Sequence, residues 1–306
     1  MIRHARQSNE EAVVSAGVIV SLWLEMRPRQ WVKNLAVLAP LLFSQRLGNL
    51  ASVEEALLAF ASFCLISSSI YLVNDICDCE QDRVHPQKCH RPLVVGQLNR
   101  NVALCAIGVL ALTAVAIGEL LNSLFVWVVA GYWVLNLFYA LRLKHHVILD
   151  VFTVAAGFVL RVVGGAVAIG VEASEWLLIC SSLLALFLGF SKRRHELLLL
   201  KGTAGAHRRV LGEYDPHFLD MMIGIVTACT VVSYALYTVS AATVERFHTR
   251  GLLATSPFVL YGIFRYLYLV YHKDSGGDPA NLLLTDRPLL INLILWAVTA
   301  IAILYA

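Results

Sequence analysis

The sequence predicts an all-α, polytopic membrane protein, with nine transmembrane helices arranged around a central cavity and an N-terminal interfacial helix in front of them. Of its 306 residues 58% are hydrophobic and 15% are charged, and the mean hydropathy is +0.70. Such a chain is far more apolar than a soluble domain. Its apolar residues also gather into runs close to the roughly 20 residues that cross a bilayer. We therefore expect membrane lipids around the protein and no nucleic-acid partner.

The runs give the helices in order. They cover residues 32–45, 53–77, 102–121, 123–142, 149–170, 176–191, 218–241, 252–272 and 288–305, and the first and sixth are short. The earlier apolar stretch from Ala12 to Leu24 is followed closely by charged residues, which favours an interfacial helix over a tenth span. It has no small-residue cleavage site, so we expect no removable signal peptide. The chain divides into an N-terminal cytoplasmic or interfacial segment, 1–30, and a transmembrane domain, 31–306.

The distribution of positive charge predicts the orientation. On this helix assignment most of the 24 lysines and arginines fall in the N-terminal region and the even-numbered loops, although the formal net charge is only +3. By the positive-inside rule these parts are cytoplasmic. We therefore expect a multi-pass protein of the cell membrane whose polar motifs face the cytoplasm. Two arginines, Arg161 and Arg265, fall inside predicted helices.

An acidic motif follows the second apolar run. On a helix Asn74, Asp78 and Asp82 lie at i, i+4 and i+8, and Asp75 joins the same oxygen-rich face. Hard oxygen ligands without a histidine cluster suit Mg²⁺, which proteins usually hold with one or two carboxylates plus substrate phosphates. The motif therefore predicts a magnesium diphosphate site. The plainer alternative is a solvated acidic helix end.

Zinc and disulfides are not expected. Cys77, Cys79, Cys89 and His90 lie near the acidic motif, but the C-x-C spacing differs from that of zinc knuckles. The seven cysteines mostly lie in spans or on the reducing cytoplasmic side.

Basic residues accompany the acids. Arg83, Lys88 and Arg91 lie in the loop after the acidic motif, which predicts an anion bound between the two kinds of charge. The same residues also supply the positive-inside signal.

A second polar cluster joins the fourth and fifth runs. It contains Tyr139, Arg142, Lys144, Asp150 and Arg161. An arginine inside an apolar helix must face a polar cavity, an acid or an anionic ligand, because exposure to lipid is expensive. We favour a site-lining role for Arg161 over a structural salt bridge to Asp150 or Asp78.

A third cluster closes the sixth run. Lys192 and Glu196 form an i, i+4 pair there, and this basic end could meet a phosphate. Arg193 and Arg194 are better explained as contacts to lipid headgroups. Between the last two runs the polar stretch 274–288 could form a lid.

The motifs together resemble the UbiA superfamily of intramembrane prenyltransferases. The resemblance rests on Asn74-Asp75-x-x-Asp78-x-x-x-Asp82 followed by Arg91-Pro92 and Gly96. The decaprenyl-phosphate phosphoribosyltransferase branch is suggested by Arg27-Pro-Arg-Gln-Trp-Val-Lys-Asn34, Tyr71-Leu-Val-Asn-Asp75, His85-Pro-x-Lys88, Tyr139-x-Leu-Arg-Leu-Lys-His145, Leu149-Asp150, Gly157-Phe-x-Leu-Arg161 and Lys192-Arg-x-x-Glu196-Leu. Prenyltransferases of this kind usually carry a second aspartate-rich motif, whereas the corresponding region here is mainly basic.

The resemblance implies Mg²⁺-dependent transfer of 5-phosphoribosyl from phosphoribosyl diphosphate to a polyprenyl phosphate, with release of diphosphate. In the family this product feeds the synthesis of arabinofuranosyl donors for cell-surface glycans. Asp75, Asp78 and Asp82 would hold the metal, with Asn74 ligating or orienting. Further substrate contacts are expected from Lys33, Arg83, Lys88, Arg91, Tyr139, Arg142, Lys144, Asp150, Arg161, Lys192 and Glu196.

Two other functions stay open at this point. An aromatic prenyltransferase with a polyprenyl diphosphate donor would use the same first acidic motif. A non-catalytic lipid-binding or transport protein would also tolerate polar residues in the membrane, but it would not need Asn74 to Asp82 beside Arg91. The sequence leaves the oligomeric state open, a homo-oligomer included.

Overall fold

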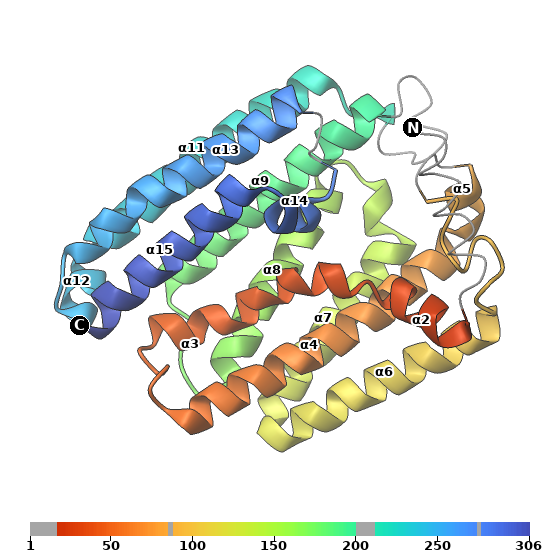
Figure 1. The fold of residues 1–306 in the computed structure, drawn as a ribbon, viewed down its shortest axis with the longest axis horizontal. Coiled ribbons are helices and arrows are strands. Elements are labelled where there is room, and N and C mark those ends of the chain that lie inside the picture. The colour runs from red at the N-terminus through yellow and green to blue at the C-terminus, as the bar shows by residue number, and fades with distance from the viewer. Residues whose placement is uncertain (1–16, 85–87, 200–211, 274–276) are drawn as a thin grey trace.

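The computed structural model describes residues 17–84, 88–199, 212–273 and 277–306, and all regular secondary structure in this part of the chain is helical (Figure 1). Eight of its helices are long and apolar enough to cross a membrane. They are α4 (Leu50–Cys77), α6 (Arg100–Leu121), α7 (Ser123–Leu141), α8 (Leu149–Ala168), α9 (Glu175–Leu199), α11 (Pro216–Val239), η4 (Gly251–Thr255) continuing into α13 (Ser256–His272), and α15 (Arg287–Tyr305). The protein is therefore a multi-pass membrane protein, although the predicted count of nine is not confirmed.

The first predicted span, 32–45, is an irregular helix. It consists of a 3₁₀ helix, η1 (Pro28–Leu38), and the short α3 (Ala39–Phe43). Polar residues interrupt its apolar face, and Pro40 lacks the N–H that a regular helix would use. The segment still packs between α4 and α8, where the carbonyl of Val37 presses on Gly165 so closely that an added Cβ would collide with it.

The sixth predicted span is longer than its apolar run. The sequence predicts residues 176–191, whereas α9 runs from Glu175 to Leu199. Its last turns carry Lys192, Arg193 and Glu196, which pair with one another along the helix. Ion pairs at i, i+3 and i, i+4 support a helix beyond the point where its apolar residues end.

Short helices complete the chain. The predicted interfacial helix corresponds to α2 (Val18–Met26), while residues 1–16, including its predicted start at Ala12, lie outside the described residues. The others are α5 (Cys79–Arg83), η2 (Leu143–His145), α12 (Ala241–Phe247) and α14 (Pro279–Thr285). His85 and residues 274–276 of the predicted lid also lie outside the described residues, as do Lys201, Arg208 and Arg209, three of the basic residues counted for the orientation.

The long helices form a ring. Consecutive members α7, α8, α9, α11, α13 and α15 pack side by side, and α4 packs on α6, α7 and α8 (Figure 1). The α3 region closes the ring on α15, since Leu42 and Phe43 pack near Trp296. The ends of α4, α7, α9 and α13 lie on the same side as the starts of α8, α11 and α15, because the helices alternate in direction. The polar motifs therefore gather at one end of the bundle.

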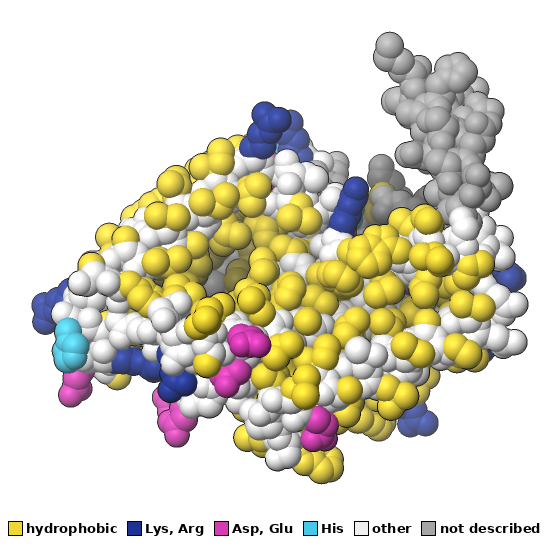
Figure 2. All heavy atoms as spheres, turned by 60° about the horizontal axis from the view of Figure 1, so that its bottom comes forward, with side chains coloured by type: hydrophobic (Ala, Val, Ile, Leu, Met, Phe, Trp, Pro, Cys, Tyr) yellow, Lys and Arg dark blue, Asp and Glu magenta, His cyan; other side chains and the backbone are white. Residues whose placement is uncertain are grey.

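The outer surface suits a bilayer. Figure 2 shows a face covered mainly by hydrophobic side chains, with charged groups near its edges. Leu112, Trp127 and Ile225, from three different spans, are each more than half exposed. Large apolar side chains in contact with solvent would be costly in water, and in a membrane protein they meet lipid.

Candidate active site

The acidic motif lies where α4 ends, and it is not one continuous helical face. Helix α4 stops at Cys77, Asp78 follows it in a non-helical conformation, and α5 begins at Cys79. The predicted i, i+4, i+8 alignment therefore breaks at Asp78. Asp75 and Asp82 are nonetheless both buried, at 1% and 2% exposure, so two carboxylates are held inside this end of the bundle.

Each carboxylate of the motif pairs with basic side chains. An Nη2 atom of Arg27 lies 2.6 Å from Oδ2 of Asp75, and Arg91 Nη1 lies 2.7 Å from its Oδ1. The same Nη1 of Arg91 also contacts Asp82. These pairs join the end of α2, 48 positions from Asp75, to the end of α4 and to the loop that follows α5.

Two lysines extend the network. Lys88 Nζ lies 3.7 Å from Asp82, and Lys144 pairs with Asp78. Burial lowers the pKa of Lys88, against the opposing effect of Glu196 and Asp82. Glu196 therefore lies near enough to influence Lys88, which brings the end of α9 to the acidic motif.

Two carboxylates of the acidic motif lie close enough to contact one positive charge. Among the described residues, no three His, Cys, Asp or Glu side chains already gather as a metal-binding group, and this includes the cysteines near the motif. However, one nitrogen of Arg91 contacts oxygens of both Asp75 and Asp82, so these two oxygens can share a single positive charge. A set of hard carboxylate oxygens fits Mg²⁺. The predicted metal role of Asn74, Asp75, Asp78 and Asp82 stays a prediction.

Sequence reasoning missed a buried acid beside the motif. Glu25, on α2, is 2% exposed and accepts a hydrogen bond of 2.8 Å from the backbone N–H of Leu93. Burial and the neighbouring Asp75 raise the pKa of Glu25 to about 8. Arg27, which pairs with Asp75, adopts a left-handed conformation, with φ of 54°, where α2 ends. An acid and an arginine at the end of an apolar stretch were the only local signal for this contribution.

A second network surrounds Arg193. Its Nε lies 2.8 Å from Asp150, its Nη2 donates to Tyr139 over 3.1 Å, and it also pairs with Glu196. The hydroxyl of Tyr214 donates to Asp150 over 2.7 Å. Arg193 is 3% exposed, so its predicted contact with lipid headgroups is wrong. Its charge instead pairs with Asp150, the one acid of the second polar cluster.

Arg161 is held by uncharged groups alone. Its guanidinium donates to Oδ1 of Asn34 over 2.7 Å, to the hydroxyl of Tyr132 over 2.7 Å and to the carbonyl of Gly157 over 3.0 Å. It is 5% exposed and makes no salt bridge within the described residues. The alternative of a salt bridge to Asp150 or Asp78 is therefore wrong. A buried guanidinium without a counter-charge favours an anionic ligand.

An acid from the C-terminal region joins the site. Asp278 caps the short α14, and its Oδ2 accepts a hydrogen bond of 2.8 Å from Gln30. Burial opposes its ionisation, but this hydrogen bond and the positive charges of Lys33 and Lys192 lower its pKa. Lys33 itself makes no hydrogen bond or salt bridge with another described residue, whereas Lys192 lies 3.8 Å from Glu196. Asp278 thus lies among the basic groups for which phosphate binding was predicted.

Three predicted residues lie apart from these networks. Arg83 is exposed and pairs with Glu80 in its own helix, and Arg142 is exposed at the end of α7. Asn74 is half-buried, and its backbone carbonyl accepts from the N–H of Asp78. Their predicted roles in binding remain predictions.

Comparisons with known proteins give consistent results. The sequence model of the UbiA prenyltransferase family matches residues 36–294. The decaprenyl-phosphate phosphoribosyltransferase of Mycolicibacterium smegmatis is 34% identical over 98% of this chain and 99% of that protein. The protein of the same name from Corynebacterium glutamicum is 33% identical over 92% of this chain and 85% of its own length.

A solved structure shares the fold. The structure of a UbiA homolog from Archaeoglobus fulgidus bound to GPP and Mg²⁺ matches with a TM-score of 0.72 and 20% identity, over 94% of this chain and 100% of that one. At this identity the match concerns the architecture of the helices.

Proposed function

The chain belongs to the UbiA prenyltransferase family, and from this membership we propose that it is a polyprenyl-phosphate phosphoribosyltransferase. The reaction transfers the 5-phosphoribosyl group of phosphoribosyl diphosphate to a decaprenyl-like polyprenyl phosphate and releases diphosphate. Two relatives that bear the name of this activity are more than 30% identical over most of the chain, which supports the proposal.

The acidic motif is proposed to receive the diphosphate of the donor through Mg²⁺. Asp75, Asp78 and Asp82 would hold the ion, with Asn74 ligating or orienting. When bound, the ion offsets the charge that develops on the leaving diphosphate. The basic groups that pair with these carboxylates, Arg91 and Lys144 among them, lie beside the proposed donor and can neutralise further phosphate charge.

The remaining basic groups are proposed to bind the other two phosphates. Arg161, Lys33 and Lys192 would divide between the 5-phosphate of the ribose and the phosphate of the lipid. Asp278 offers a carboxylate oxygen that can accept hydrogen bonds from the ribose hydroxyls. Tyr139 can donate a hydrogen bond to either phosphate.

The transfer needs no strong protein base. The bond between ribose C1 and the diphosphate oxygen breaks, and both of its electrons leave with the diphosphate. An oxygen of the polyprenyl phosphate forms the new bond to C1 from the opposite face, with inversion. Because that oxygen is already anionic, the protein only has to position it and to balance its charge.

One observation carries the choice of this reaction over an aromatic prenyl transfer. Asp150 pairs with the buried Arg193 and accepts from Tyr214, and Arg161 lies in the same region without a counter-charge. A second metal-binding acidic cluster would need several carboxylates there, and the segment from Tyr139 to Arg161 contains one acid, Asp150. Because Asp150 is already paired and Arg161 is buried without a counter-charge, this region favours a second phosphate-bearing substrate instead.

The proposed orientation follows from the charges. The N-terminal region, the loop that carries Lys88 and Arg91, and the end of α9 all belong to the side rich in lysine and arginine. By the positive-inside rule the active site faces the cytoplasm, where phosphoribosyl diphosphate is available.

A substrate comparison tests the proposal. Purified protein is incubated with Mg²⁺ and either labelled phosphoribosyl diphosphate plus polyprenyl phosphate, or labelled polyprenyl diphosphate plus aromatic acids. We expect label in a new lipid product from the first mixture alone. Prenylation of an aromatic acid in the second mixture, with no product in the first, would replace the proposal by the aromatic prenyltransferase.

A further inference from the structure

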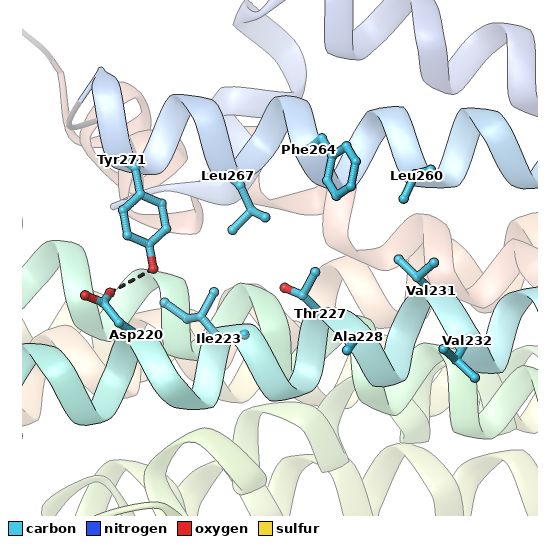
Figure 3. Close-up of a pocket in the computed structure, with 11 residues that line it drawn as sticks. Asp220, Ile223, Thr227, Ala228, Val231, Val232, Leu260, Phe264, Leu267 and Tyr271 are labelled. Carbon is cyan, nitrogen blue, oxygen red and sulfur yellow. Dashed lines mark hydrogen bonds between the residues drawn. The ribbon is translucent and has the colours of Figure 1, made fainter.

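An open groove runs between α11 and α13 on the outside of the ring (Figure 3). Its volume is about 440 Å³, and its walls are mainly apolar, with Ile223 and Val231 on α11 and Phe264 and Leu267 on α13. Gly224 lies on its wall and has no other heavy atom within 4 Å of the place where a Cβ would stand. Since both helices are candidate membrane spans, the groove opens to the hydrocarbon of a bilayer.

Charged groups of both signs close one end of the groove. The hydroxyl of Tyr271 donates to Oδ1 of Asp220 over 2.8 Å, as Figure 3 shows. Nε of Arg194 donates to the same oxygen, and its guanidinium lies over the ring of Tyr271, 4.1 Å from the ring centre. Oδ2 of Asp220 accepts no hydrogen bond from any described residue, and the Asp220 side chain is 37% exposed. We call this end of the groove, formed by Arg194, Asp220 and Tyr271, its cap. The cap presents an accepting carboxylate oxygen beside a guanidinium.

A further polar group lies deeper in the groove. Thr227 points toward α13 in Figure 3, and its hydroxyl oxygen is buried without a hydrogen-bond partner among the described residues. It stands about two helical turns beyond Asp220 along α11. A buried hydroxyl of this kind is usually satisfied by a ligand or water.

We propose that this groove binds one zwitterionic aminophospholipid, such as phosphatidylethanolamine, from the surrounding membrane. The ammonium group of the lipid meets Asp220, its phosphate meets Arg194, and one acyl chain lies along the apolar walls. Thr227 donates to an ester carbonyl. A phospholipid presents its ammonium, phosphate and ester groups in this order toward the bilayer centre.

The charge of the cap selects this lipid class. A purely anionic headgroup would gain the contact with Arg194 but would be repelled by Asp220. A quaternary ammonium headgroup carries the right charge, yet it has no N–H to donate to the open oxygen of Asp220. A zwitterionic headgroup with a primary ammonium suits both residues, because its ammonium donates to Asp220 and its phosphate accepts from Arg194.

Native mass spectrometry of the delipidated full-length protein tests the site. Phosphatidylethanolamine, phosphatidylcholine and phosphatidylglycerol with identical acyl chains are added in turn, and bound lipid is counted. We expect one tight phosphatidylethanolamine adduct, with binding about tenfold weaker for the other two lipids, the loss expected from one hydrogen bond to a charged group. Equal binding of all three lipids would overturn the proposal.

Two matched glycine variants locate the adduct. Gly224→Leu places a side chain in the groove, whereas Gly108→Leu places the same side chain on α6, where the glycine is likewise exposed and has open space around its Cβ position. We expect Gly224→Leu to weaken phosphatidylethanolamine binding about tenfold and Gly108→Leu to leave it unchanged. Asp220→Asn, a smaller change, should remove the preference for phosphatidylethanolamine over phosphatidylglycerol. Unchanged binding in Gly224→Leu, or displacement of the adduct by polyprenyl phosphate, would contradict the assignment.

Discussion

Replacement of Arg161 by glutamine tests whether its buried charge binds substrate. The guanidinium has five N–H donors, and Asn34, Tyr132 and Gly157 engage three of them. Two donors remain for a phosphate. If each contributes about 1.5 kcal/mol, as hydrogen bonds to charged groups do at the lower end of their range, the variant loses about 3 kcal/mol of binding. This corresponds to a roughly hundredfold rise in KM for the phosphorylated substrate that Arg161 contacts.

Initial rates give the assay. Each substrate is varied while the other is saturating, and KM is compared between wild type, Arg161→Gln and a matched control, Arg265→Gln. Arg265 is also an arginine inside an apolar helix, but it is paired with Asp286, with its Nη2 2.8 Å from Oδ2. We expect the control to lower thermal stability without changing either KM. If Arg161→Gln leaves both KM values within twofold of wild type, Arg161 has a structural role and the argument from its missing counter-charge fails.

Three further variants test other parts of the site. Asp82→Asn keeps the shape of the side chain but removes a proposed metal ligand, so activity should be lost at saturating Mg²⁺ while circular dichroism stays unchanged; full turnover would refute the metal assignment. Asp278→Asn should raise KM for phosphoribosyl diphosphate about tenfold and leave KM for the lipid unchanged, since one hydrogen bond to a charged group is weakened; equal effects on both substrates would argue against the ribose contact. Glu25→Gln tests the pKa of about 8 of Glu25 in magnesium-free protein. Native Glu25 keeps a proton that the unfolded chain, with a pKa near 4.5, releases. The free energy of unfolding of wild type should therefore fall by a few kcal/mol between pH 5 and 8. The variant should lack this fall in thermal unfolding, and parallel pH profiles would contradict the raised pKa.

The sequence predicted the architecture well because the bilayer imposes a length on each apolar run. The eight long helices agree with predicted runs to within a few residues at most ends. The exceptions are the segments where polar residues enter the pattern. Pro40 and the polar residues before it turn the first run into a 3₁₀ helix, and the pairs around Glu196 extend α9 beyond its apolar part.

The sequence predicted those residues of the candidate site that belong to recognisable local motifs. Arg91 pairs with Asp75 and Asp82 of the acidic motif, and Lys144 pairs with Asp78, although the helix that carries the acids breaks at Asp78. Arg27 and Asp278 were missed because helix packing, rather than local spacing, brings them in. Arg27 pairs with an aspartate 48 positions away, and Asp278 bonds to a glutamine 248 positions away.

The transferred group distinguishes the proposed reaction from every alternative, and a double label measures it directly. Phosphoribosyl diphosphate is prepared with ¹⁴C in the ribose and ³²P in the terminal phosphate of the diphosphate, and it is incubated with the protein, Mg²⁺ and polyprenyl phosphate. The proposal predicts ¹⁴C in the lipid phase and an equal amount of ³²P in the aqueous phase as diphosphate. Appearance of ³²P in the lipid, or of neither label, would contradict it.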